Sequence, residues 1–192
     1  VTEEVWGVDL VGWMIALAAG ELPPLAQLRD SLTPSGHAIQ ARVYAEDPGR
    51  QFQPSPGLLT DVAFPADDRR TLRIDSWVES GCEVPPFFDP MLAKIIAWQP
   101  TREAAVHALH DALGATRLYG VETNRTYLQQ ILTFAPFACG EPWTRCLEGL
   151  TYQAYTLEVL SAGTQTTVQD HPGRVGYWAV GVPPSGPMDS RA

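Results

Sequence analysis

The sequence is short of the features that mark several common classes of protein. Lys and Arg together number only 13, the formal net charge is −9, and no run of five basic residues occurs. Because contacts to phosphates need clustered positive charge, this composition argues against nucleic-acid binding. The longest apolar stretch, residues 11–20, is far shorter than the roughly 20 residues that cross a bilayer, so the sequence predicts no membrane segment.

Cysteine is also scarce, and short catalytic motifs are missing. Cys82, Cys139 and Cys146 form no C-x-x-C pair, and the four histidines do not complement them. We therefore expect no metal site, and reduced thiols in a cytoplasmic protein. The sequence has no G-x-x-x-x-G-K-[ST] loop, no G-x-G-x-x-G and no G-x-S-x-G elbow. These gaps predict that the chain carries no complete active site.

Hydrophobic residues make up 45% of the chain, and their spacing predicts strands. Residues 37–46 alternate, with apolar side chains at the odd positions 39–45 and a polar face formed by Gln40, Arg42, Tyr44 and Glu46. Residues 91–98 are apolar apart from Lys94, which is typical of a strand buried on both faces. A short strand within 53–64 and an alternating strand within 71–81 are predicted to be antiparallel neighbours.

Three helices are predicted near residues 9–19, 102–114 and 124–134. The first places Leu10, Trp13, Met14 and Leu17 on one face, the second is capped by Thr101, and the third has Thr123 or Asn124 as its cap. We expect all three to pack on an antiparallel sheet, which is an α+β fold. From Thr156 onward the sequence changes to short β-like pieces, so we expect a boundary between about Leu150 and Thr156.

The polar face around Arg42 is the sharpest candidate for a functional site. A guanidinium can bind a carboxylate, bicarbonate or phosphate through a fixed fork of donors, but a solvent-facing strand with cross-strand ion pairs has the same pattern. Asp89 is either a turn residue or a carboxylate held against a cation. Lys94 is either a desolvated lysine or one that reaches solvent from the edge of an apolar run. His107 and His110 are expected on a solvated helix face.

A family resemblance adds to this interpretation. Between Val1 and Leu150 the sequence contains, in order, VTEEVWGVDLV, GHAIQARVYAEDP, FQPSPGLLT, RIDSWVESGCEVPPFFDPMLAKIIAW, TREAAVHAL and GVETNRTYLQQIL. This series resembles the C-terminal domain of biotin carboxylase. By that resemblance Arg42 matches the arginine that binds bicarbonate and stabilises the biotin enolate. Gln40, Glu46 and Asp89 are then expected to help bind substrate or biotin, with Asp89 orienting the arginine.

Residues 156–192 form the second expected domain. The run LEVLSAGTQTTVQDHPGRVGYWAVGVPPSGPMDSRA resembles the start of the carboxyltransferase domain of urea carboxylases, a region similar to allophanate hydrolase subunit 2 and the KipA family. The chain begins without Met and stops within this Gly- and Pro-rich stretch. We therefore expect both ends to be cuts in a longer protein.

Together the two resemblances imply a fragment of a urea carboxylase, within or outside a urea amidolyase. Such enzymes are ligases that use ATP, Mg²⁺ and biotin to convert urea and bicarbonate into allophanate. The family's Gly-rich ATP loop, metal carboxylates, second catalytic arginine and biotinylated lysine lie outside this sequence, so we expect the fragment alone to be inactive and to hold no cofactor.

The expected partners are the rest of the biotin carboxylase domain, the carboxyl carrier and the carboxyltransferase. Two alternatives stay open. The chain is an assembly module, with residues 58–74 as the dimerisation region and a homodimer as its product, or the acceptor is guanidine or a similar compound. A stand-alone KipA-like interaction protein explains only the last segment of the sequence.

Overall fold

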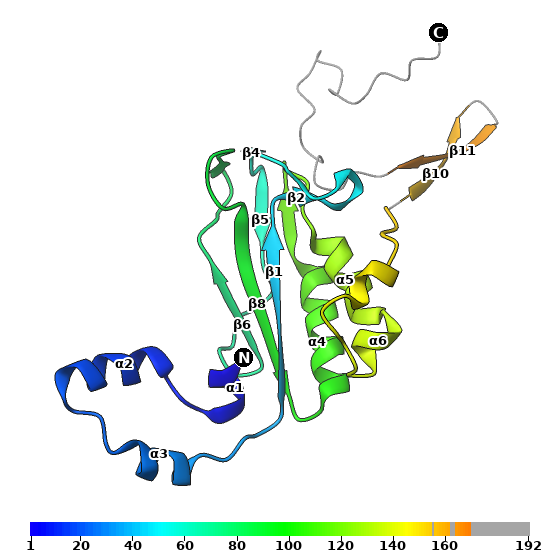
Figure 1. Ribbon diagram of the computed structural model, residues 1–192. Coiled ribbons are helices and arrows are strands. Elements are labelled where there is room, and N and C mark those ends of the chain that lie inside the picture. The colour runs from blue at the N-terminus through cyan, green and yellow to red at the C-terminus, as the bar shows by residue number, and fades with distance from the viewer. Residues whose placement is uncertain (155, 162–163, 170–192) are drawn as a thin grey trace.

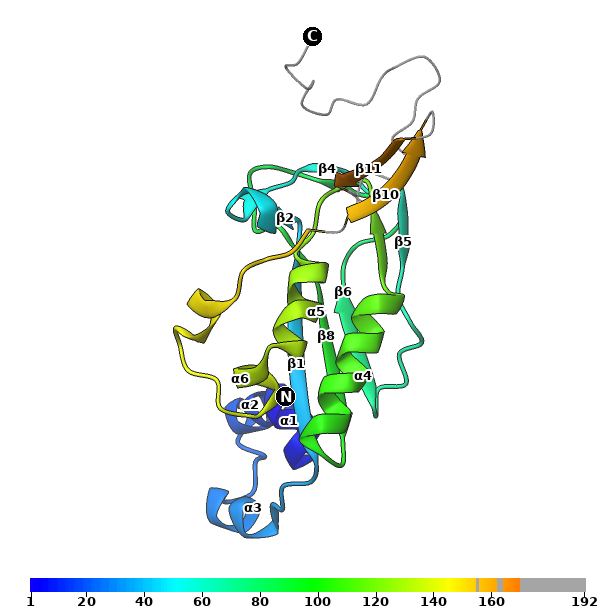
Figure 2. The same cartoon turned by 90° about the vertical axis from the view of Figure 1, so that its right-hand side faces the viewer.

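Strand β8, Met91–Gln99, is the centre of a three-stranded antiparallel sheet in this computed structural model, which describes residues 1–154, 156–161 and 164–169 (Figure 1). Strand β1, His37–Tyr44, pairs with one edge of β8, and β6, Leu72–Ser76, pairs with the other. Helices α4, Arg102–Ala115, and α5, Arg125–Thr133, cover one face of this sheet (Figures 1 and 2). The α+β class expected from the sequence is confirmed.

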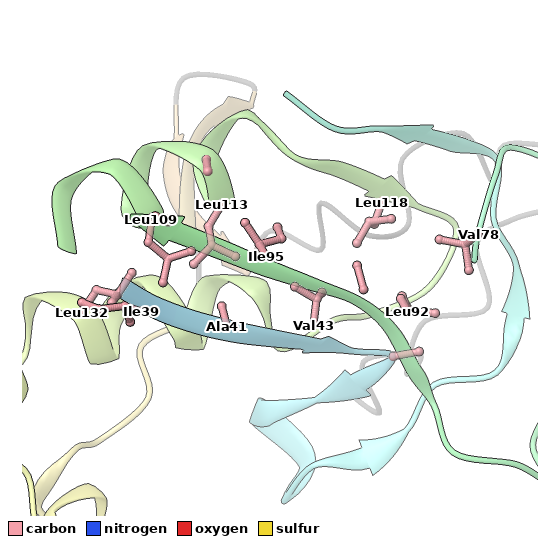
Figure 3. Close-up of a cluster of buried hydrophobic side chains, with 14 of the residues drawn as sticks. Ile39, Ala41, Val43, Val78, Leu92, Ile95, Leu109, Leu113, Leu118 and Leu132 are labelled. Atoms are coloured by element: carbon pink, nitrogen blue, oxygen red, sulfur yellow. The ribbon is translucent and has the colours of Figure 1, made fainter. Parts of the chain in front are cut away.

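The main core lies between the sheet and these two helices. Side chains from β1, β8, α4 and α5 meet there, namely Ile39, Ala41, Val43, Ile95, Leu109, Leu113 and Leu132 (Figure 3). The predicted alternation of β1 is confirmed, because its odd-numbered residues from Ile39 to Ala45 are buried. The prediction that β8 is buried on both faces holds in part, since Ile96, which points away from this core, is only 4% exposed, whereas the side chain of Lys94 on the same face is 37% exposed.

The outer strands pair differently from the prediction. Strand β5, Asp61–Ala63, pairs with β9, Arg117–Tyr119, and β4, Gly57–Leu58, pairs with β7, Glu83–Val84. The strands predicted within 53–64 and 71–81 therefore form no strand pair with each other, which corrects the prediction. The two segments still meet where Gly81 N donates to Leu59 O at 2.7 Å. The long apolar strand β8 takes β6 as a partner instead, because Leu72 and Ile74 then pack against the main core. A further short pair joins β2, Glu46–Asp47, to β3, Gln53–Pro54, around the 3₁₀ turn η1, Pro48–Arg50.

The predicted helix over 9–19 exists, but it does not pack on the sheet. Helix α2, Leu10–Ala19, starts at Asp9, whose carboxylate accepts a hydrogen bond from Gly12 N, and it ends at Gly20. With α1, Thr2–Trp6, and α3, Leu25–Ser31, it lies to one side of the sheet (Figure 1). Met14 and Leu17 are 70% and 62% exposed, so the apolar side chains of α2 find little cover within the described part of the chain.

The described part of the chain continues beyond α5 with short elements. Helix α6, Ala135–Ala138, and the 3₁₀ turn η2, Cys146–Gly149, lead to a hairpin of β10, Thr156–Ser161, and β11, Thr164–Gln169. This hairpin agrees with the short β pieces expected after Thr156, whereas the predictions for residues 170–192 lie outside the described residues. None of the helices described combines the length and the apolar character needed to cross a bilayer.

Gly120 allows the loop after β9 to pass close to the chain between β4 and β5. Its φ angle is 109°, and a Cβ atom there would overlap the carbonyl oxygen of Leu58 and lie 3.0 Å from the amide nitrogen of Thr60. Gly81 provides a comparison, because its φ is 93° but a Cβ atom would meet nothing within 4 Å. Both positions carry backbone strain for other residues, but only Gly120 carries a steric clash.

We predict that Gly120→Ala destabilises the protein by about 3 kcal/mol or more, because backbone atoms of Leu58 and Thr60 must move. Gly81→Ala should cost about 1 kcal/mol, the strain of the positive φ alone. Urea unfolding of both variants measures the difference. Equal losses would show that the close approach at Gly120 is relieved without cost.

Candidate functional site

The face of the sheet opposite α4 carries a row of charged residues. Arg42 on β1 pairs in register with Lys94 on β8, and Lys94 pairs in register with Asp75 on β6. Cross-strand partners project from the same face, so the three side chains are neighbours. Lys94 Nζ lies 3.2 Å from Asp75 Oδ2. Lys94 is thus an ion-paired lysine on the polar face.

Arg73 is a second cation on this face, and it forms ion pairs with three carboxylates. The guanidinium of Arg73 lies 3.0 Å from Asp75, 3.2 Å from Glu3 and 3.5 Å from Glu4, and so ties α1 to β6. The hydrogen bond with Asp75 raises the pKa of Arg73. Burial by itself would raise the pKa of Asp75, but Arg73 and Lys94 outweigh it and hold that pKa below its usual range. Arg69 lies 3.8 Å from the same carboxylate. Asp75 is therefore ionised and surrounded by three cations.

Arg42 is the contrast in this row. Its side chain is exposed, and within the described part of the chain it has no side-chain hydrogen bond and no ion pair. Its neighbour Lys94 has the same charge, and Asp75 already pairs with Lys94, Arg73 and Arg69. The structure thus leaves the five donors of this guanidinium available, which is the arrangement that an anion-binding arginine needs.

Gln40, Glu46 and Asp89 lie around the same strand. Gln40 is half-buried and pairs in register with Ile96, next to Arg42 on the polar face. Glu46 lies in β2 just beyond the end of β1, and burial raises the pKa of its carboxyl. The negative charge of Asp89 adds to that rise, and a backbone hydrogen bond from Ala45 N to Pro90 O at 2.8 Å joins the segments that carry the two carboxyls.

Asp89 itself has the geometry of a turn residue. Its Oδ1 accepts a hydrogen bond from Met91 N at 3.0 Å, at the start of β8. Within the described residues its carboxylate forms no ion pair with Arg42 or another cation. The structure therefore places Asp89 beside Glu46 and fixes the entry into β8, but it does not show Asp89 orienting the arginine.

Asn124 is a residue of this site whose role sequence reasoning missed. It was predicted as a helix cap, and it does precede α5, but its side chain makes no cap hydrogen bond. Instead Tyr44 N donates to Asn124 Oδ1 at 2.9 Å, and Asn124 Nδ2 donates to Arg42 O at 3.2 Å. Asparagine is common at helix starts because its side chain can bond to the backbone of the first turn. The sequence therefore gives no sign of this contact with a strand 80 residues away.

The remaining candidates stay apart from this face. His107 is exposed and His110 is half-buried on α4, with His110 Nδ1 lying 3.6 Å from Asp111. Cys82, Cys139 and Cys146 are free thiols. Across the described ranges, no group of three or more His, Cys, Asp or Glu side chains could hold a metal ion.

Comparison with known proteins defines the class to which this fold and charged face belong. Residues 40–149 match the biotin carboxylase C-terminal domain, a stretch that contains most of β1, all of β8, α4 and α5, and the candidate site residues from Gln40 to Asn124. The chain belongs to this family.

Individual relatives agree. The urea amidolyase of Saccharomyces cerevisiae is 44% identical over 190 residues, which is 99% of this chain and 10% of that protein. The solved urea carboxylase of Kluyveromyces lactis is 45% identical with a TM-score of 0.75, covering 99% of this chain and 16% of that one. The biotin carboxylase domain dimer of Hydrogenobacter thermophilus 2-oxoglutarate carboxylase, solved with MgADP and bicarbonate, is 35% identical with a TM-score of 0.71 over 77% of this chain and 32% of that one. The chain thus spans about a tenth of its curated urea amidolyase relative.

We predict that Asp89→Asn lowers the pKa of Glu46 toward, but not to, its ordinary value of 4.5, because burial remains when the neighbouring charge is gone. The pKa of Glu46 is raised in the folded state, so folding stability should fall as pH rises from the unfolded value through the raised one. Glu46→Gln should abolish this part of the pH dependence and Asp89→Asn only reduce it. Carboxyl NMR titration measures the pKa directly, and an unchanged Glu46 pKa in Asp89→Asn would show that the two carboxyls are not coupled.

Proposed function

We propose that this chain is part of the biotin carboxylase component of a urea carboxylase, a ligase that converts urea, bicarbonate and ATP into allophanate. The single observation that carries the proposal is the unpaired guanidinium of Arg42 in a domain of the biotin carboxylase family. The proposal that urea is the acceptor is supported by how much of this chain aligns with urea enzymes. Alignments with the S. cerevisiae and K. lactis urea enzymes extend over 99% of the chain, whereas the family match ends at residue 149.

Arg42 has the role of an electrostatic stabiliser in this proposal. Its fork of donors would bind bicarbonate and then the ureido oxygen of biotin, on which negative charge grows when the ring nitrogen loses its proton. A cation that is fixed before the reaction stabilises this transition state more than the ground state. Gln40, Glu46 and Asp89 would complete the binding surface around it, with the half-buried carboxyl of Glu46 at one end of the strand.

The cofactors divide between this chain and the rest of the enzyme. A biotin ureido group fits the polar face, because Arg42 offers donors that no described side chain occupies. Biotin would supply the nitrogen that carries the carboxyl group. The described part of this chain offers no cluster of metal ligands, so we assign ATP and Mg²⁺ to the remainder of the biotin carboxylase domain.

The partners proposed for this chain are other domains of the same enzyme. We assign residues 1–150 to the biotin carboxylase C-terminal domain and 156–192 to the start of a carboxyltransferase domain. The exposed apolar side chains of α2 supply a surface for the rest of the biotin carboxylase domain, with the carboxyl carrier and carboxyltransferase domains as further partners. The three free thiols suit a cytoplasmic enzyme.

A second candidate function is assembly. The related H. thermophilus biotin carboxylase domain was solved as a dimer, and Leu58 in the region 58–74 is 46% exposed here. In this alternative the chain supports a homodimer of an enzyme that acts on guanidine or another acceptor. Comparing urea with guanidine in the full-length enzyme decides the acceptor, and dimerisation that depends on residues 58–74 would support the assembly role.

We predict that Arg42→Ala and Arg42→Lys in the full-length enzyme lower biotin carboxylation by on the order of 10²-fold, the loss typical of removing one donor to a developing oxyanion. Lysine restores the charge but not the planar fork, so it should not rescue activity. Arg29→Ala is the matched control, because that guanidinium is exposed and pairs with the adjacent Asp30. Near-normal biotin carboxylation by Arg42→Ala would mean that Arg42 belongs to an ordinary solvent-facing strand.

We also predict that the 192-residue chain alone neither hydrolyses ATP nor carboxylates free biotin. Phosphoryl transfer needs backbone donors around the phosphates together with bound Mg²⁺, and we assign both to other segments of the enzyme. A bicarbonate-dependent ATPase assay on the purified chain measures this. Turnover above that of a heat-denatured sample would overturn the division of labour proposed above.

A further inference from the structure

Arg42 and Tyr44 pair with β8 on one side of β1, but their backbone groups on the other side face no strand of this sheet. The strand order is β1-β8-β6, so β1 forms an edge whose outward backbone groups need other partners. Asn124 supplies them. Tyr44 N donates to Asn124 Oδ1 at 2.9 Å, Asn124 N donates to Tyr44 O at 3.1 Å, and Asn124 Nδ2 donates to Arg42 O at 3.2 Å.

These three hydrogen bonds lie across an irregularity in the sheet. The register between β1 and β8 shifts between Val43 and Tyr44, because Val43 pairs with Ala93 whereas Tyr44 pairs with Met91. Such a shift bends a strand and changes the direction of the side chains beside it. Asn124 binds the backbone on both sides of the shift, at Arg42 and at Tyr44. It therefore fixes the local bend.

The direction of Arg42 depends on that backbone. The side chain of Arg42 has no hydrogen bond or ion pair within the described residues. The backbone of β1 therefore determines the direction in which this side chain leaves the strand. Asn124 is only 7% exposed, and its helix is tied to α4 because Arg125 Nη1 donates to Leu113 O at 2.9 Å. Through its side-chain amide, Asn124 therefore links the backbone of Arg42 to the helices α4 and α5.

We propose that Asn124 is a positioning residue for Arg42: by binding the backbone of Arg42 and Tyr44 across the register shift, it aims the guanidinium at the reacting anion. This rests on the function proposed above for Arg42. The side chain makes no helix-cap bond, so its removal does not act through loss of a cap on α5.

The test uses the full-length enzyme. Asn124→Ala should lower kcat for biotin carboxylation by on the order of 10-fold, while the KM for ATP stays unchanged, because a misaligned group loses rate rather than nucleotide binding. Gln130→Ala is the matched control, in the helix α5 that Asn124 precedes. Its amide also makes two side-chain-to-backbone hydrogen bonds, both to Gln153 at 2.6 and 3.0 Å, and this variant should keep its kcat.

Asn124→Asp has the same shape as the native side chain and carries the test if Asn124→Ala fails to fold. A carboxylate can still accept from Tyr44 N but cannot donate to Arg42 O, so kcat should stay low. Wild-type kcat in Asn124→Asp, or equal kcat values in Asn124→Ala and Gln130→Ala, would overturn the proposal.

A double variant separates this proposal from the function of Arg42 itself. If Asn124 acts through Arg42, adding Asn124→Ala to Arg42→Ala should change kcat by less than about 2-fold. The same 10-fold loss in both backgrounds would show that Asn124 acts elsewhere. Near-normal activity of the single Arg42→Ala variant would instead contradict the proposed function, whatever Asn124 does.

Discussion

The antiparallel pairing of β1 with β8 is the constraint on which the rest of this structure depends. Strand β8 fills the core with one face and pairs with a strand on each edge, so the register of both neighbours is fixed, and every second residue of β1 from Ile39 onward enters the core under α4. The same register places Arg42 beside Lys94 and Lys94 beside Asp75. The polar face is thus a direct consequence of filling the core, because a strand cannot bury one set of side chains without presenting the other.

Charge balance then decides which cation on that face is free. Arg73 and Lys94 share Asp75, and Arg73 also takes Glu3 and Glu4 from α1. These contacts stabilise the packing of the first helix on the sheet edge and engage the carboxylates of Asp75, Glu3 and Glu4. Arg42 is left with a like-charged neighbour and unoccupied donors, an arrangement that costs stability in isolation and favours binding of an anion. All these cations lie on one face of the sheet, so only their partners distinguish them: Arg73 and Lys94 form ion pairs, whereas Arg42 does not.

Much of this arrangement could be predicted from the sequence because it is local. The alternation over 37–46 and the apolar run 91–98 determine which faces are buried, and Thr101 marks the start of α4 as expected, with its hydroxyl accepting from Ala104 N at 3.2 Å. Features that depend on distant segments were not predictable in this way. Periodicity does not identify which distant segment a strand or side chain will contact, as in the pairing of β5 with β9 and the contact of Asn124 with β1. It also does not show whether an apolar helix face is covered, and that of α2 is exposed. The role of Arg42 came from resemblance to the family, whereas its unpaired state came from the structure.

The central claim is that Arg42 is held by its backbone and kept free to bind an anion. A structure of the full-length enzyme with bicarbonate tests it most directly. The account predicts that the guanidinium of Arg42 lies within about 3 Å of the bicarbonate oxygens, while Lys94 and Arg73 keep Asp75 as their partner. An Arg42 guanidinium locked in an ion pair with a carboxylate from another part of the enzyme, with bicarbonate bound elsewhere, would contradict it.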